Sequence, residues 1–398
     1  MKCSTGCTGI CLSLALAGSA HVSTAQSVDT IFMRVAWQVT EGRHPTADSL
    51  GRLSGVAVDR QGTVYVSDMS EARVWVFDAQ GRSVGSIGRR GRGPGEFESP
   101  TGAAIAPNGR LVIRDVIHVS RFNTDSRTGR LTRFDDSFRG PLFPNWTSTR
   151  TSRFTDDGRM FHPAYAYVDG SLRSARYDIY SARGQLLDSL IVPPFPSAPT
   201  GEAIVRLGPS DAKIVRGLGR VPFAPQPFWD ITRAGTLIRG DGTSYRLIES
   251  DRSGRVLREI RRNAPVERIP PTERRDSAQA LRARIDSLNV PLNQVRGMPD
   301  EVRAVRLPEN FPAINGVFAA PDGMIWVRRW TAASSGRTIF DVFDRTGTYT
   351  RVVVLPQIIA SLPTPVLTLS YVAAVAIDPE SGTHSVVHFS PHAAGRSR

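Results

Sequence analysis

Residues 53–100 read LSGVAVDRQGTVYVSDMSEARVWVFDAQGRSVGSIGRRGRGPGEFESP, and this stretch decides the fold. It contains four short runs rich in Val, Ile, Tyr, Trp and Phe: 56–58, 63–67, 73–77 and 83–87. Turns that contain Asp and Gly stand at 59–62 and 78–81. Runs of this composition, separated by such turns at close spacing, are typical of antiparallel strands joined as a meander. We therefore expect one four-stranded sheet here.

The same pattern recurs along the chain. Its clearest marker is a turn glycine followed by an apolar strand, found at Gly62, Gly109, Gly158, Gly235 and Gly323. The first two steps are 47 and 49 residues long, which fits one four-stranded sheet per step. The next two steps, of 77 and 88 residues, leave room for insertions at about 193–227 and 264–312. Repeated four-stranded meanders predict the blades of a β-propeller.

The chain ends on an incomplete blade. Three strand-like runs follow one another at 366–370, 371–378 and 383–390, and a fourth is missing there. An apolar, β-like run at 30–38 precedes the first blade and can supply it, which would close the ring and remove exposed sheet edges. We predict an all-β fold: a six-bladed β-propeller of four-stranded antiparallel blades, with the last blade closed by the N-terminal strand, over residues 26–398.

The second insertion contains a predicted helix near 272–288. Thr272 can cap its N-terminus, and Glu273 lies in the first turn, where a negative charge is favourable. An apolar stripe follows at helical spacing: Ala278, Leu281, Ile285 and Leu288. We interpret this helix as structural cover on the propeller rim. A lid over the channel mouth is the alternative.

The N-terminus has the pattern of a secretory signal peptide over residues 1–25. Lys2 precedes an apolar run at 10–20, and small residues at 23–25 suit a cleavage site. We therefore expect an exported protein, periplasmic or extracellular, with no membrane span after cleavage. All three cysteines lie in this segment: Cys3, Cys7 and Cys11. The mature chain would then have no disulfide, no cysteine–zinc site and no cysteine nucleophile.

The formal net charge is +13, and nearly all of the positive charge is arginine, because only Lys2 and Lys213 are lysines. A charge of this size can indicate a nucleic-acid partner or an acidic surface. The arginines, however, are spread along the chain, and the one dense cluster is at 89–92. We interpret them as a solvated basic surface and expect no nucleic-acid partner, since an exported protein meets little nucleic acid.

The motif at 88–100 (GRRGRGPGEFESP), together with 62–68 (GTVYVSD) and 73–77 (RVWVF), resembles the NHL-repeat and TolB-like six-bladed β-propellers. The resemblance covers about residues 30–390 and is most specific in the first two blades. It implies an exported bacterial propeller, and a fold of this kind does not decide function. The glycine-rich loop joins two strands, whereas phosphate loops run from strand to helix. We therefore interpret it as an inter-blade linker, with Phe97 wedged between blades.

The repeat makes one rim position comparable between blades. Six residues after the turn glycine stand Asp68, Asp115, Ala164, Asp241 and Arg329, where the second strand of each blade ends. Our leading interpretation is structural, with Asp accepting N–H bonds from the next loop. The functional alternative is a ligand site at the channel mouth, where arginines hold an anion and an aromatic ring stacks on it. Its candidate residues are Asp68, Arg114, Asp115, Asp241, Arg328, Arg329 and Trp330.

No catalytic residues can be assigned. The sequence contains no Gly-x-Ser-x-Gly motif, and its histidines are scattered. His384 and His388 are four residues apart in a strand-like segment, which separates them by roughly 13 Å, so we assign no metal site and no cofactor. We expect a monomeric binding module for a protein, a peptide or a small anionic ligand rather than an enzyme.

The alternative is a metal-dependent hydrolase of the gluconolactonase/paraoxonase propeller type. Such propellers hold a divalent cation such as calcium in the channel through carboxylate and Asn ligands from several blades. The resemblance does not carry these ligands over, because Ala164 and Arg329 interrupt the acidic positions.

Overall fold

The computed structural model describes residues 29–40, 50–116, 118–124, 133–140, 150–168, 171–194, 202–206, 213–217, 221–287, 295–296, 304–378 and 381–392. The predicted signal peptide lies outside the described residues. Within the described part of the chain, no helix is both long and apolar enough to cross a membrane.

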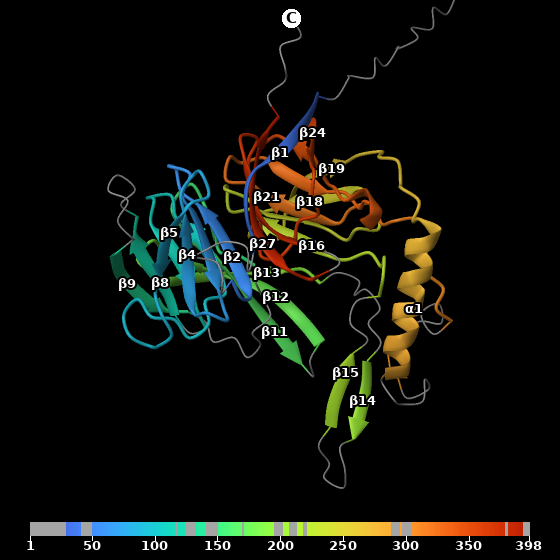
Figure 1. Ribbon diagram of the computed structural model, residues 1–398, viewed down its shortest axis with the longest axis horizontal. Coiled ribbons are helices and arrows are strands. Elements are labelled where there is room, and N and C mark those ends of the chain that lie inside the picture. The colour runs from blue at the N-terminus through green and yellow to red at the C-terminus, as the bar shows by residue number, and fades with distance from the viewer. Residues whose placement is uncertain are drawn as a thin grey trace, which may run out of the picture.

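Four separate sheets of four antiparallel strands form the first four blades, and in each the strands follow one another in chain order (Figure 1). Blade 1 contains β2 (Leu53–Val58), β3 (Val64–Asp68), β4 (Arg73–Phe77) and β5 (Ser83–Ile87). Blade 2 contains β6 (Gly102–Ile105), β7 (Leu111–Arg114), β8 (His118–Asn123) and β9 (Arg133–Arg139). Blade 3 contains β10 (Arg153–Phe154), β11 (Met160–Val168), β12 (Ser171–Tyr180) and β13 (Leu186–Val192). Blade 4 contains β16 (Phe228–Ile231), β17 (Leu237–Gly240), β18 (Arg246–Ser250) and β19 (Val256–Arg261).

The last two blades are joined into one eight-stranded sheet. Blade 5 contains β21 (Gly316–Ala319), β22 (Ile325–Arg328), β23 (Thr338–Phe343) and β24 (Tyr349–Leu355). Blade 6 contains β25 (Val366–Leu367), β26 (Val372–Ile377), β27 (His384–Pro391) and the N-terminal strand β1 (Asp29–Thr40). The first residues of β1, 29–32, pair in parallel with β24, and most of the remainder pairs antiparallel with β27. The predicted closure of the ring by the N-terminal strand is therefore confirmed.

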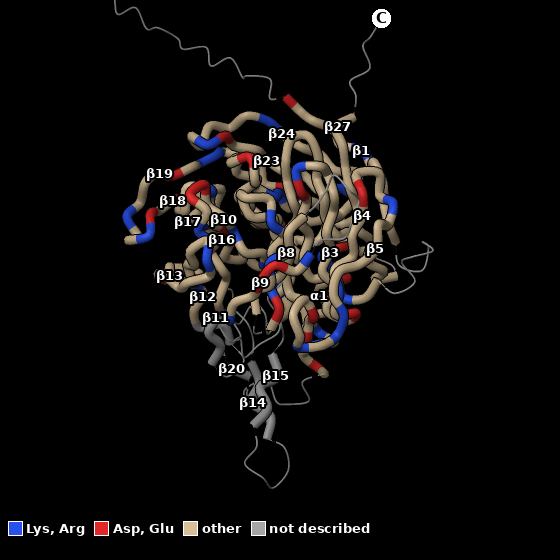
Figure 2. Tube along the Cα trace, turned by 90° about the vertical axis from the view of Figure 1, so that its left-hand side faces the viewer, with Lys and Arg blue, Asp and Glu red and all other residues tan. Residues whose placement is uncertain are grey.

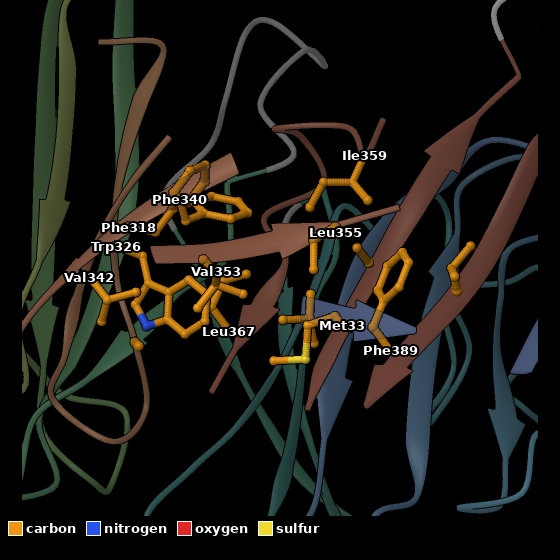
Figure 3. Packing of buried hydrophobic residues seen from close by; sticks show 14 of the residues in the cluster. Met33, Phe318, Trp326, Phe340, Val342, Val353, Leu355, Ile359, Leu367 and Phe389 are labelled. Atoms are coloured by element: carbon orange, nitrogen blue, oxygen red, sulfur yellow. The ribbon is translucent and has the colours of Figure 1, made fainter. Parts of the chain in front are cut away.

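The blades pack face to face, and their first strands contact one another around the axis, as β2 does with β6 and β16 does with β21. The core between blades 5 and 6 shows how β1 enters this packing. Met33 of β1 lies in one cluster with Trp326, Phe340 and Phe389 (Figure 3), and all four are at most 5% exposed. Burial of large apolar side chains of this kind is the main source of stability between blades.

The linker between blades 1 and 2 has the predicted role. Phe97 is fully buried among residues of both blades, and its ring centroid lies 5.9 Å from that of Phe122. Gly88 has φ +79°, and a Cβ there would lie 2.3 Å from the Phe97 ring. A side chain at position 88 would therefore be strained in its backbone and would also displace the wedge.

The two insertions meet outside the blades. The first contains β14 (Glu202–Arg206) and β15 (Lys213–Gly217), and the second contains α1 (Pro271–Ser287) and β20 (Val295–Arg296). β20 pairs with β14, so the insertions share a three-stranded sheet. The predicted helix is present, with Leu281 and Ile285 of its apolar stripe buried. The carboxylate of Glu273 accepts a hydrogen bond from the backbone N–H of Ala333, which fixes α1 to a loop of blade 5.

Candidate functional site: the central channel and its two ends

Asp68 stands at the rim end of β3, and its surroundings match the structural interpretation. The side chain is fully buried, and its carboxylate accepts hydrogen bonds from Gly51 N (2.7 Å), Ser70 N (3.0 Å), Glu71 N (3.2 Å) and Trp75 Nε1 (3.1 Å). The two loop N–H groups that follow it are the partners that the local Asp pattern predicts. Both carboxylate oxygens are therefore engaged within the blade.

Asp115 and Asp241 also bind loop groups. Asp115 is buried and accepts N–H bonds from Glu98 (2.8 Å) and Ser99 (2.7 Å), which fixes the linker that enters blade 2. Asp241 accepts from the backbone N–H (2.9 Å) and the hydroxyl (2.7 Å) of Thr243. These contacts give each carboxylate a role in holding a rim loop.

Arg329 lies in a buried ionic network between blades 4 and 5. Its guanidinium binds Asp341 of β23 through Nε (2.9 Å) and Nη2, and Asp341 is fully buried. Burial lowers the pKa of Arg329, but the hydrogen bond and charge of Asp341 outweigh it, so that this pKa is raised. Asp341 also accepts from three groups: Arg262 Nη1 (2.7 Å), Tyr245 Oη (2.7 Å) and Tyr349 Oη (2.9 Å). This carboxylate therefore already occupies the fork of Arg329.

Trp330 packs under the insertions. Its ring is stacked on Phe311, with centroids 5.6 Å apart and planes 10° apart, and lies edge-on to Phe223. Its Nε1 donates to the carbonyl of Ile314 at 3.1 Å. The rings belong to a small apolar cluster with Ile269, which anchors both insertions to blade 5.

Two of the predicted arginines, Arg114 and Arg328, occupy equivalent places in blades 2 and 5. Each ends the second strand of its blade and pairs with a glycine of the first strand. They are 4% and 9% exposed. Arg328 Nη1 donates to Ser361 Oγ at 2.8 Å, and burial lowers the pKa of Arg328 to about 10. Blades 2 and 5 are opposite in a ring of six, so these two positive charges lie on opposite sides of the ring.

The segment between β24 and β25 crosses the channel. Val366 pairs with Ala373, and the same register, continued along the strand, would place residue 363 opposite Ala376. The residue that bridges to Ala376 is Ile359, so the segment contains more residues than a regular strand would need. The extra residues bulge away from the sheet. Within them, Thr364 Oγ1 accepts a hydrogen bond at 3.4 Å from the backbone N–H of Thr151 in the opposite blade 3. This contact narrows the channel partway along its length.

Beyond this crossing, towards the turns that contain Gly62 and its equivalents, a cavity of about 280 Å³ lies on the axis. The innermost strands or adjoining turns of all six blades line it. Its charged lining residues are Asp59, Arg60, Arg153 and Arg233. Asp59 accepts hydrogen bonds from Gln61 N, Thr63 N and Tyr65 Oη at 2.9, 2.9 and 3.1 Å. Among the described residues, three arginines and one carboxylate therefore line this cavity.

A collar of residues two positions before the turn glycines surrounds this end of the channel: Arg60, Pro107, Asp156, Arg233 and Pro321. Arg60 Nη2 donates to the carbonyl of Pro107 at 3.1 Å. Arg233 Nε donates to Asp156 at 2.6 Å, and its Nη1 donates to the carbonyl of Pro321 at 2.8 Å. Each contact joins neighbouring blades. The comparison of repeats that identified the residues of the opposite rim also finds these residues, two positions before each turn glycine.

Arg153 and Tyr371 belong to the polar lining of this cavity. Arg153 binds Asp230 of blade 4 through Nε (2.8 Å) and Nη2 (2.5 Å), and Asp230 also accepts the N–H of Ala319 in blade 5. Burial, followed by the charges of Asp59 and Asp322, raises the pKa of Tyr371. Its phenol therefore stays protonated at neutral pH and can donate a hydrogen bond.

The histidines in the described part of the chain do not gather into a site. His384 and His388 lie on one strand, and the His388 ring is stacked between Trp37 and Tyr371, with centroids 5.3 and 5.4 Å away. His162 is buried in blade 3, with Nδ1 3.0 Å from Ser152 Oγ. In the described part of the chain, no three His, Cys, Asp or Glu residues are grouped so that they could hold a metal ion.

Residues 48–139, which include blades 1 and 2, match the DUF5128 family, described as a 6-bladed β-propeller. No protein with a curated description matches the chain. The chain is similar to a solved protein of unknown function from Bacteroides caccae, with 12% identity, TM-score 0.36, and coverage of 76% of this chain and 86% of that one.

Two further solved structures are similar over most of their length. One is a candidate exported protein from Bacteroides fragilis, with 12% identity and TM-score 0.45, covering 90% of this chain and 98% of that one. The other is virginiamycin B lyase from Staphylococcus aureus, with 10% identity and TM-score 0.40, covering 89% and 99%. The blades of the structure identify the chain as a β-propeller, and the family matched by blades 1 and 2 is described as six-bladed.

Proposed function

We propose that this propeller is an exported, non-catalytic binding module that holds a small anion, bearing carboxylate or phosphate groups, in the arginine-lined end of its channel. The observation that supports this most is the arginine lining of the axial cavity, where Arg60, Arg153 and Arg233 line the wall and Arg60 donates to a backbone carbonyl rather than to a carboxylate. Export rests on the signal-like pattern of residues 1–25.

Arg60 is the residue that this proposal depends on most. Arg153 and Arg233 each bind a carboxylate, whereas the contact of Arg60 is to a backbone carbonyl, which leaves its charge uncompensated by that bond. A guanidinium can bind a carboxylate or phosphate in bidentate fashion, and the walls of a channel focus the field of its charges. The hydroxyl of Tyr371 supplies a neutral donor on the same wall.

The same charges argue against a divalent cation in this cavity. A hard cation requires several oxygen ligands, and arginine side chains repel it. The carboxylates nearest the cavity, Asp59, Asp156 and Asp230, already accept hydrogen bonds from their neighbours. We therefore propose anion binding and not the channel-metal hydrolase.

The test is Arg60→Ala, titrated calorimetrically with citrate and with inorganic phosphate at low ionic strength. We expect the native protein to bind at least one of the two, and the variant to bind at least tenfold more weakly. Arg82→Ala is the matched control, because Arg82 is an exposed turn arginine of the same blade and its removal changes the net charge equally.

Loss of binding in Arg60→Ala but not in Arg82→Ala would support the proposal. Equal weakening in both variants would indicate a non-specific effect of net charge and would overturn it. Failure of the native protein to bind either anion would overturn it as well. Arg60→Lys should recover part of the affinity, since lysine keeps the charge but loses the bidentate fork.

A further inference from the structure

A second cavity, of about 390 Å³, lies on the opposite face, at the seam where β1 closes the ring. We call it the seam pocket. Its polar lining residues are Gln38 and Thr40 of β1, Gln357 after β24, and Asp378, Ser381, Thr383 and Ser385 around the β26–β27 turn. The blade 5 loop contributes Ala333 and Gly336. The volume lies within the range of small-molecule sites.

A hydrogen-bond relay organises one wall of the seam pocket. Gln357 Nε2 donates to Gln38 Oε1 at 3.0 Å, and Gln38 Nε2 donates to Thr40 Oγ1 at 3.3 Å. Thr40 Oγ1 lies 3.0 Å from Ser385 Oγ. Four side chains from three segments are thus held in fixed relation to one another. A wall built in this way presents its remaining hydrogen-bonding capacity in set directions.

The segment that carries Gln357 is itself fixed. Thr338 Oγ1 donates to the carbonyl of Gln357 at 3.0 Å and accepts the N–H of Ile359 at 3.1 Å. Gln357 Oε1 is buried and has no hydrogen-bond partner among the described residues. A buried acceptor without a partner costs free energy, so a small shift that brings a donor to this atom would be favourable.

The chemistry of the seam pocket differs from that of the channel cavity. Among the described residues, Asp378 is the one charged residue of its lining, and no lysine or arginine lines it. Hydroxyls and primary amides each donate and accept hydrogen bonds, so this lining is suited to a ligand with many hydroxyl groups. Ile358, Ala376 and Ile377 add an apolar surface that can contact the C–H face of such a ligand.

We propose that the seam pocket binds a neutral saccharide. This goes beyond the anion site of the channel and does not depend on it. The recognition depends on the amide–hydroxyl relay of Gln38, Gln357, Thr40 and Ser385, so one end of the site is supplied by the strand that closes the ring.

The test uses the purified full-length chain with glucose, N-acetylglucosamine, maltose and cellobiose as probes, measured by calorimetry and saturation-transfer NMR. We expect at least one of these sugars to bind. Thr40→Val keeps the shape of the side chain and removes its hydroxyl, and Gln38→Leu removes the amide. Each variant should weaken binding at least tenfold.

Gln185→Leu is the matched control, because Gln185 lies exposed in a turn of blade 3 and the substitution is of the same type as that at Gln38. Gln185→Leu and Arg60→Ala should both leave sugar binding unchanged. If Gln38→Leu lowers the melting temperature strongly, the proposal is tested with Thr40→Val and Ser385→Ala instead. Binding that is unaffected by the relay variants, or no binding of any of the four sugars, would overturn the proposal. Arg60→Ala separates this outcome from failure of the channel site.

Discussion

His162 is a buried histidine that must stay neutral in the folded protein. It is 1% exposed, and burial, followed by the positive charge of Arg114, lowers its pKa well below the ordinary value. Asp178 stands opposite it on the neighbouring strand, and the Tyr180 ring lies edge-on with its centroid 6.2 Å away. The unfolded chain has no such environment, so there the same ring takes a proton below about pH 6.5.

We therefore predict that stability falls as the pH falls. Above about pH 6.5 the ring is neutral in both states and its contribution does not change with pH. Below that value the unfolded state binds a proton that the folded state refuses, which destabilises the fold by up to about 1.4 kcal/mol per pH unit. Urea unfolding at pH 7.5, 6.0 and 5.0 should show this slope of the unfolding free energy against pH. His162→Gln should reduce the slope by an amount that corresponds to the uptake of up to one proton on unfolding.

A second histidine, His388, also contributes to the pH dependence and must be included in the control. Burial also lowers the pKa of His388, so some pH dependence should remain in His162→Gln and should shrink further when His388→Gln is added. The slope rather than the absolute stability is compared, because either substitution changes packing. An unchanged slope in the double variant would show that these rings do not control the acid sensitivity.

Single residues also show where prediction from sequence stops. The loop N–H partners of Asp68 stand two and three residues after it, and a local rule for Asp predicts them. The partner of Arg329 is Asp341 on the next strand, and two further members of that network, Tyr245 and Arg262, come from another blade. Contacts between blades depend on how the blades are set against one another, which no local pattern contains.

At the scale of elements, the strands of the blades are predictable from their apolar runs and turn residues, most specifically in the first two blades. The turn glycines mark where the blades lie in the sequence, and the long steps between some of them indicate where the insertions lie. The pairing of β14 with β20 was not predictable, because short strands in two separate insertions carry no signal of each other. The seam pocket was missed for a similar reason, since Gln38 and Gln357 are 319 residues apart.

Trp330 supplies the prediction at this scale. Its stacking on Phe311 indicates that it anchors the insertions to blade 5. We expect Trp330→Ala to lower the free energy of unfolding by roughly 2 kcal/mol, less than the ~3–5 kcal/mol for a fully buried aromatic, because Trp330 is only half-buried. Limited proteolysis should cut first within residues 264–312 while the blades stay resistant.

Trp37→Ala is a suitable comparison, since Trp37 is half-buried on β1 and donates a hydrogen bond to Ala79 of blade 1. It should not expose residues 264–312 to early cleavage. The opposing result is that Trp330→Ala leaves the cleavage pattern unchanged and abolishes binding of an anionic probe. That result would contradict the anchoring role and would place the Trp330 ring in a ligand site at the rim.

At the scale of the whole molecule, contacts between neighbouring blades hold the ring together, and the hydrogen bond between Thr151 and Thr364 links opposite blades. Basic and acidic segments are interspersed in the described part of the chain, as Figure 2 shows. The exceptional element is β1, which joins the first part of the chain to the last two blades. It pairs with β24 on one side and β27 on the other.

This double pairing predicts that the ring depends on β1 for closure. Removing residues 1–40 would leave β24 and β27 with unpaired edges and would take Met33 and Val39 out of two buried clusters. Open edges of this kind promote aggregation. We expect this truncated chain to melt at least 10 °C lower and to aggregate at micromolar concentration, measured by calorimetry and light scattering. Removing residues 1–28 keeps all of β1 and should leave both properties unchanged, because every pairing of the closing strand is retained. A chain without β1 that melts like the native protein would mean that the remaining blades close the ring without it.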